Sequence, residues 1–434
     1  MSTKTATKPI VRPRRVKKPR EKRELEPFQK MDYTYFVLVL VLLGFGLTML
    51  YSASFPQALS KFGDSLHFIK PQLLFAGAGI VIALVVSLLP RALYGNKTLI
   101  AVYTLFCFVL MLYARFKPVN QGGADRWVTM FGVTFQPSEF LKVAVILCIA
   151  YISTIDYDEY KLKPHAEQKS AVLNALMFFE SGKSMTSRST LVRVVLWLPT
   201  VVCKFFGMYT LNCVILGLAC IVTIAQPHLS GTIIIFLVGT IMGFVAESKK
   251  RRVFAQVLVF AVGGLLAIAL VKPEYMSVRF QNMTDVESDI TGATFQTYQS
   301  LIAIGSGGFS GVGFGESHQK YAYIPAAHND FLFSVIVEEL GFIGGVVMIT
   351  LFAVMVVRGI NIAVRNTNRY SSLLVFGITM QLGIQALLNI AVVSNSFPNT
   401  GISLPFMSYG GTALIIQMIE VGLVLAVSRR SQLK

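Results

Sequence analysis

The chain is short of charged residues and of paired cysteines. Only 14% of its 434 residues are charged, whereas 54% are hydrophobic and the mean hydropathy is +0.62. Its 5 cysteines lie in or beside apolar segments without paired spacing, which is typical of small core residues rather than of a disulfide framework. The composition therefore indicates a polytopic membrane protein.

Motifs of several enzyme classes are also missing. The sequence has no His and Cys cluster with zinc spacing, no lysine after a glycine loop in the Walker pattern, and no Gly-x-Ser-x-Gly elbow. A glycine run over 305–315 could cradle a phosphate, but the strand and helix that such a loop requires are not evident. We predict instead that these glycines serve backbone flexibility and close packing.

What the chain does have is a series of apolar runs, each about long enough for a helix that satisfies its own hydrogen bonds in lipid. The runs cover 34–53, 71–90, 98–114, 135–155, 210–226, 231–246, 253–271, 331–357, 371–393 and 402–427. They predict an all-α polytopic membrane protein with about ten transmembrane helices. The segment 194–206 is also apolar, but it is short and carries Pro199 and Lys204, so we do not count it as a span.

Basic residues set the predicted orientation, because short loops rich in Lys and Arg stay in the cytoplasm. Such residues recur in every second connection: Arg91, Lys97, Lys161, Lys163, Lys169, Lys249, Lys250, Arg251, Arg252, Arg358, Arg365, Arg369, Arg429 and Arg430. Both termini are thus predicted to be cytoplasmic. A large extracytoplasmic loop, 272–330, would join helices 7 and 8, and its length and tyrosines predict a folded lid.

The N-terminal tail, residues 1–31, is predicted to be disordered and cytoplasmic. Residues 1–30 hold 11 Lys or Arg against 3 Glu, which explains much of the net charge of +17. Beside a first span, such a tail favours a topology signal and contact with anionic membrane lipids, not with nucleic acid. No cleavable signal peptide is visible. The transmembrane domain is predicted over 32–428, with a cytoplasmic loop at 156–209.

One carboxylate stands out by its position. Asp330 ends the long outer loop, directly before the apolar run 331–357, so it would lie at the outer membrane boundary. There it could act on a lipid-linked substrate. A shorter outer loop carries Arg126 and Trp127.

These and other motifs, in their order and spacing, resemble the SEDS family (shape, elongation, division and sporulation), the FtsW, RodA and SpoVE type. The match covers most of 32–427 and rests on Tyr51-Ser52-Ala53-Ser54, Arg126-Trp127, Gln136-Pro137-Ser138-Glu139-Phe140-Leu141-Lys142, Gln226-Pro227, Gln299-Ser300, His328-Asn329-Asp330-Phe331, Glu338-Glu339-Leu340-Gly341, Leu404-Pro405 and Ser408-Tyr409-Gly410-Gly411. The long basic tail favours the division type. The loop 156–209 is longer than the family pattern implies.

The resemblance implies a polymerase that joins lipid II disaccharides into glycan strands, with Asp330 as catalytic base. The acceptor sugar hydroxyl must lose a proton as it attacks, and a carboxylate within hydrogen-bond reach can take it. A glycosidase usually needs a second carboxylate to protonate the leaving oxygen. A lipid pyrophosphate already leaves well, so a single base suffices.

Charge neutralisation of the pyrophosphate is predicted for Arg126 and Lys142, with a divalent cation (Mg or Mn) as a candidate cofactor. Arg126 could equally anchor headgroups together with Trp127. Glu139 lies three residues before Lys142 and could simply pair with it. The family motifs add further candidate substrate-binding residues: Gln136, Ser138, His328, Ser408 and Tyr409.

Other polar residues have structural alternatives. Glu338 and Glu339 lie in an apolar run and are expected to form hydrogen bonds between helices or to the turn near Ser408, although one could face a cavity. His328 could orient or tune Asp330, cap the following helix, or bind interfacial water.

The chain departs from the family pattern at four positions. Ala322 and Ala326 stand where Glu is often found, His228 where Asp is usual, and Asn329 where Thr is usual. These differences leave the base intact but weaken any metal site built from neighbouring carboxylates.

The family resemblance also implies partners and a location. The partners are a class B penicillin-binding protein with transpeptidase activity and other divisome or elongasome membrane proteins. The location is the bacterial inner membrane, with the active site outside and the division septum as one place of action. Two rival functions stay open: a lipid II flippase or transporter, and a non-catalytic envelope scaffold.

Overall fold

The computed structural model describes residues 31–162 and 209–431, except 117–118, 122–123, 131, 227, 248–249, 272–280, 282, 288–293, 322–323 and 325–326. Several predictions fall outside the described residues: the tail 1–30, most of the loop 156–209 with its apolar segment 194–206, and the positions of Ala322 and Ala326. The domain boundaries drawn from the sequence stay predictions.

A helix occupies each of the ten predicted spans. The helices are α1 (Tyr33–Phe62), α2 (Ile69–Ser87), α4 (Lys97–Phe116), α5 (Pro137–Leu162), α8 (Tyr209–Ala225), α9 (Leu229–Ala246), α10 (Lys250–Val271), α13 (Leu332–Arg365), α14 (Arg369–Val393) and α15 (Gly411–Ser431). Eight of them are long and apolar enough to cross a membrane: α1, α2, α4, α5, α9, α13, α14 and α15. The chain is a multi-pass membrane protein, while the number of crossings stays a prediction. Two shorter helices, α3 (Arg91–Tyr94) and α12 (Phe295–Ser306), lie in connections.

The prediction of an all-α fold is wrong in one place. The connection between α4 and α5 forms a three-stranded antiparallel sheet of β1 (Val119–Gln121), β2 (Ala124–Met130) and β3 (Val133–Phe135), in the order β1-β2-β3. A search for apolar runs of membrane length does not detect strands this short. They satisfy their backbone groups by pairing with each other outside the helices.

Helix boundaries also differ from the apolar runs. The helix α15 begins at Gly411, not at 402, because 402–410 turns back on itself and Phe406 has a positive φ of 63°. The helix α13 extends to Arg365 and has a kink at Gly341, where φ is 69°. Hydropathy marks where a chain is apolar, not where its backbone is helical.

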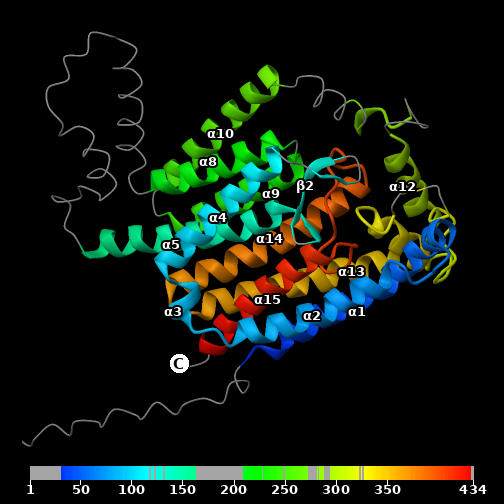
Figure 1. The fold of residues 1–434 in the computed structure, drawn as a ribbon, viewed down its shortest axis with the longest axis horizontal. Helices are drawn as coiled ribbons and strands as arrows, with labels where there is room; N and C mark the ends of the chain where they lie inside the picture. Colours follow the sequence, from blue (N-terminus) through cyan, green and yellow to red (C-terminus); the bar gives the residue numbers. More distant parts are fainter. Residues whose placement is uncertain are drawn as a thin grey trace, which may run out of the picture.

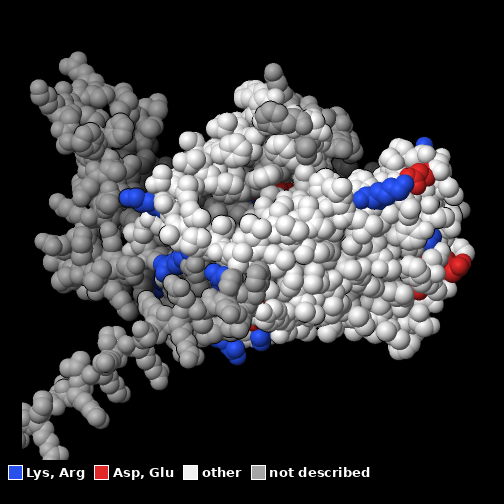
Figure 2. All heavy atoms as spheres, turned by 60° about the horizontal axis from the view of Figure 1, so that its bottom comes forward, with Lys and Arg blue, Asp and Glu red and all other residues white. Residues whose placement is uncertain are grey.

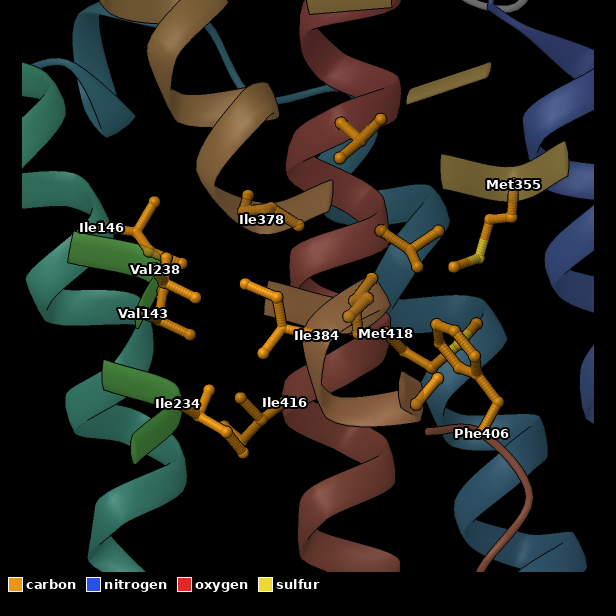
Figure 3. Packing of buried hydrophobic residues seen from close by; sticks show 14 of the residues in the cluster. Val143, Ile146, Ile234, Val238, Met355, Ile378, Ile384, Phe406, Ile416 and Met418 are labelled. Carbon is orange, nitrogen blue, oxygen red and sulfur yellow. The ribbon is translucent and has the colours of Figure 1, made fainter. Parts of the chain in front are cut away.

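The core lies between α5, α9, α13, α14 and α15, with α14 in the middle (Figure 1). Aliphatic side chains from these helices interdigitate, among them Ile146 of α5, Val238 of α9 and Ile384 of α14 (Figure 3). The helix α10 packs on α8 and α9. A polar group on α14 is therefore largely cut off from water, and its hydrogen bonds are costly to lose.

The first helix begins and the last helix ends at the same end of the bundle. The backbone N–H of Asp32 donates to Ser428 Oγ at 3.2 Å, and Arg358 pairs with the Asp32 carboxylate at 2.9 Å. Arg369 also lies there, with a hydrogen bond to the Ala246 carbonyl. On the face drawn in Figure 2, most charged side chains lie toward the two ends, and few interrupt the surface between them. This distribution is that of a bundle spanning a bilayer.

The opposite end carries the segment 307–315, which packs its backbone against the kink of α13. Val312 N–H donates to Glu338 O at 3.0 Å, and Phe342 N–H donates to Gly308 O at 2.9 Å. A Cβ on Gly311 would lie 2.1 Å from Glu339 O, and one on Gly341 would lie 2.3 Å from Gly311 N. The prediction that glycines here serve close packing is confirmed.

Candidate active site

Asp330 lies in the turn that precedes α13, at the end of the bundle opposite Asp32 and Ser428. Its side chain is partly buried. The side-chain amide of Asn389, on α14, donates to the backbone carbonyl of Asp330 at 2.7 Å and to that of Ile402 at 2.6 Å. A single buried amide thus fastens the segment that carries Asp330 to the connection between α14 and α15.

His328 is enclosed by aromatic rings. Its ring centroid lies 4.4 Å from that of Phe68 and 5.7 Å from that of Tyr409, and its carbonyl accepts the Tyr409 N–H at 3.0 Å. Burial, with a smaller effect of Lys61, lowers the pKa of His328 to about 4. His328 is therefore neutral near pH 7. It does not cap α13, whose N-cap residue is Phe331.

Ser408 and Tyr409 belong to the same connection. The Ser408 hydroxyl accepts the Leu404 N–H at 2.8 Å, so it holds the turn together. Gln72 of α2 brackets the turn, donating to Ser408 O at 3.3 Å and accepting the Gly410 N–H at 3.2 Å. Partial burial raises the pKa of the Tyr409 hydroxyl, which therefore stays protonated.

Lys142 is buried with two partners. Its ammonium lies 2.8 Å from the Glu139 carboxylate and donates to Gln385 Oε1 at 3.0 Å, and its side chain is only 3% exposed. The predicted pairing of Glu139 with Lys142 is confirmed. Gln385, one turn from Asn389 on α14, in turn donates to Ser403 O at 3.0 Å.

The remaining candidates lie near the start of α5. The Gln136 amide nitrogen lies 3.3 Å from His228 Nε2, and the buried hydroxyl of Ser138 has no hydrogen-bond partner among the described residues. Arg126 and Trp127 are on β2, where Trp127 pairs with Val119 and its side chain is partly buried. The sheet packs on α4 and α5.

Glu338 and Glu339 bind the loop that precedes α13 rather than the turn near Ser408. Glu338 accepts the Ser317 hydroxyl and the backbone N–H of His318 at 2.9 Å. Glu339 pairs with Lys320 at 2.8 Å and accepts the Ser52 hydroxyl of α1 at 2.6 Å, so the expected hydrogen bonding between helices is confirmed for Glu339.

Sequence reasoning missed three of these residues: Lys320, Gln385 and Asn389. A signal for Lys320 was present, because it is the one Lys or Arg in 281–357, and two glutamates in an apolar run need a cation. Gln385 and Asn389 carried a weaker signal, two amides four residues apart in an apolar helix.

No metal cage is evident in the part of the chain that the structure describes, since no three His, Cys, Asp or Glu side chains come together there. Residues near Asp330 instead carry buried polar atoms that are available to form hydrogen bonds with a ligand. Buried atoms without a partner among the described residues include His328 Nδ1, Asn329 Oδ1 and Asn389 Oδ1. Buried polar groups are normally paired, so such atoms together mark a site that a polar ligand can complete.

The fold and site define a multi-pass membrane protein with a polar, carboxylate-bearing site at one end of an apolar helix bundle. The family model described as "Cell cycle protein", which covers the FtsW, RodA and SpoVE type, matches residues 33–433, and the chain belongs to this family.

Relatives support this assignment along nearly the whole chain. The probable peptidoglycan glycosyltransferase FtsW of Geobacter sp. (strain M18) is 35% identical over 402 residues, covering 92% of this chain and 97% of the relative. The stage V sporulation protein E of Bacillus subtilis (strain 168) is 33% identical over 407 residues, covering 92% and 98%.

Solved structures share the fold. A chain of a peptidoglycan synthase complex that coordinates polymerization and crosslinking superposes with a TM-score of 0.67 at 23% identity, over 94% of this chain and 100% of the other. The rod shape determining protein RodA of Thermus thermophilus gives a TM-score of 0.60 at 22% identity, with the same coverage.

Proposed function

We propose that this protein is a peptidoglycan glycosyltransferase that polymerises lipid II, with Asp330 as its catalytic base. The names of its relatives support the reaction. The observation that carries the assignment of the base is the position of Asp330, partly buried just before the start of α13 and beside polar atoms with unused hydrogen-bonding capacity.

In the proposed reaction, Asp330 accepts the proton of the acceptor 4-hydroxyl as its oxygen bonds to the anomeric carbon of the donor. The bond from that carbon to the lipid pyrophosphate breaks, and the pyrophosphate leaves with the electron pair. His328 and Asn329 offer hydrogen bonds that orient the sugars. His328 is neutral, so it adds no positive charge beside the base.

Arg126 and Lys142 are proposed to stabilise the pyrophosphate. An ammonium has three N–H donors, and Glu139 and Gln385 use two of those of Lys142, which leaves one for a phosphate oxygen. A divalent cation held mainly by the pyrophosphate stays a separate proposal. The described side chains form no cage for it, and no step above depends on it.

The site is proposed to face the outside of a bacterial inner membrane, at the septum if the protein acts in division. Basic residues at the opposite end, Arg358 and Arg369 among them, support a cytoplasmic position for that end and for both termini. Such an enzyme would work with a class B penicillin-binding protein, as the structural relative from a synthase complex suggests. Other divisome or elongasome membrane proteins are further candidate partners.

A lipid flippase fits the geometry less well. A transporter needs ionisable groups free to line a path, but Glu338 and Glu339 are engaged by the outer loop, and Glu139 is paired with Lys142. The bundle interior is filled by aliphatic side chains (Figure 3).

The test incubates the purified protein and its partner with lipid II and resolves the glycan products on a gel. We expect polymer from the wild type and none from Asp330→Asn, which keeps the shape but cannot accept the proton. Polymer formation by Asp330→Asn at the wild-type rate would refute the assigned base. Lipid movement across liposomes without polymer would favour the flippase. Asp64→Asn, at an exposed carboxylate on the same end, is the matched control and should retain activity.

A further inference from the structure

Asp330 lies in the turn before α13 and Lys142 lies on α5, yet one face of α14 contacts both. Asn389 donates to the carbonyl of Asp330, and Gln385 accepts from the ammonium of Lys142. The two amides are four positions apart in the chain, so they project from the same face, one helical turn apart. The helix is central in the bundle, between α13, α5, α9 and α15.

The two amides also share a second attachment. Asn389 donates to Ile402 O at 2.6 Å, and Gln385 donates to Ser403 O at 3.0 Å. These carbonyls are consecutive in the connection that leads to Ser408 and Tyr409. Each amide therefore joins one candidate reactive group to the same short segment, and the separation of Asp330 from Lys142 is fixed through α14.

We propose that Asn389 and Gln385 are positioning residues, which hold the base Asp330 and the cation Lys142 at the spacing that one lipid-linked donor and its acceptor require. This inference rests on the proposed function. Both amides are buried, at 1% and 2% exposure, so no water substitutes readily for a lost bond. A displacement of about 1 Å at a reacting group can cost on the order of 100-fold in rate.

The test is the rate of lipid II polymerisation by the full-length protein with its partner. Asn389→Leu keeps the size of the side chain but removes its donors. We expect kcat to fall at least about tenfold while KM changes less than about threefold, because the loss affects the reacting geometry and not substrate binding. Asn212→Leu, which removes a buried amide that donates to Ser153 at 3.0 Å, is the matched control and should keep kcat.

Repeating the test in an Asp330→Glu variant distinguishes a role in positioning Asp330 from general support of the fold. Asp330→Glu displaces the carboxylate by one methylene, so the precise spacing is already lost. There Asn389→Leu should cost less than about threefold in kcat, since residues acting as one unit are not additive. An equal loss in both backgrounds, or wild-type kcat for Asn389→Leu, would overturn the proposal.

Gln385→Met tests the same idea from the side of Lys142 and decides the matter if Asn389→Leu does not fold. We expect a fall in kcat in the wild type, and little further loss when Gln385→Met is added to Lys142→Met. Additive losses would contradict the proposal. Failure of the proposed function has a different signature, namely no polymer from the wild type or full activity of Asp330→Asn.

Discussion

At the scale of the residue, the fold holds a histidine near the proposed base, Asp330, in its neutral form. His328, two residues away, is buried between Phe68 and Tyr409, and its pKa is lowered to about 4. Burial in this aromatic enclosure disfavours the charged imidazolium, so His328 carries no positive charge at neutral pH.

This enclosure makes the stability of the protein depend on pH. The folded protein keeps His328 neutral down to about pH 4, whereas the unfolded chain binds the proton near pH 6.5. The free energy of unfolding is therefore highest above pH 6.5, where His328 is neutral in both states. It falls by on the order of 3 kcal/mol in total as the pH decreases toward 4. We expect the melting midpoint to drop between pH 7.5 and pH 5, and His328→Phe to reduce that drop. His67→Phe, which removes an exposed histidine, should leave the drop in the melting midpoint unchanged. Equal drops in the wild type and both variants would contradict the assignment of this pH dependence to His328.

The sequence could place Asp330 but not its neighbours. Asp330 was found because a charge directly before an apolar run is conspicuous, and Glu139 because it lies one turn from Lys142. Asn389 and Gln385 act across 59 and 243 positions of chain, respectively, and no local pattern encodes such contacts. The ten helical segments were predictable because lipid demands long apolar runs, whereas the sheet β1-β2-β3 lies outside that constraint.

At the scale of the element, the kink of α13 determines how the segment 307–315 packs. Gly341 has a φ of 69°, and the loop approaches it so closely that a Cβ would lie 2.3 Å from Gly311 N. Gly341→Ala should therefore lower the melting midpoint strongly and reduce polymer formation, because the kink lies between Asp330 and the rest of α13. Gly77→Ala, in α2 with nothing within 4 Å of the added Cβ, should leave both unchanged or raise the midpoint. The measurement is thermal unfolding in detergent, and similar behaviour of the two variants would refute this role.

The ion pair of Lys320 with Glu339 fixes the same loop ten residues before Asp330. Both side chains are almost fully buried, and Lys320 also donates to Gly315 O at 2.6 Å. Lys320→Met leaves the Glu339 carboxylate buried without its cation, which should cost on the order of 3–5 kcal/mol. The exposed pair of Lys70 and Asp64 is the matched control, and Lys70→Met should hardly move the melting midpoint. Equal melting midpoints for Lys320→Met and Lys70→Met would show that the ion pair of Lys320 with Glu339 does not stabilise the loop.

At the scale of the whole molecule, the two ends of the bundle carry different polar side chains. One end joins Asp32, Arg358 and Ser428, and Arg369 also lies there. The other end carries Asp330, His328 and Tyr409, and the Tyr409 N–H donates to His328 O there. A lipid-linked substrate can reach such a site from the bilayer while its sugars stay in water. The polymerase hypothesis therefore requires that the Asp330 end face outward.

Cysteine labelling measures this orientation directly. Lys61 lies at the Asp330 end and Lys97 follows α3 at the other end, and both side chains are exposed. In a Cys203→Ser background the four remaining cysteines lie within apolar helices, out of reach of a charged maleimide. We expect Lys61→Cys to be labelled in intact spheroplasts and Lys97→Cys only after the membrane is permeabilised, because Arg and Lys near Lys97 hold that end in the cytoplasm. The reverse pattern would place Asp330 inside the cell, where no extracytoplasmic glycan strand could be built, and would overturn the proposed function as well as the topology.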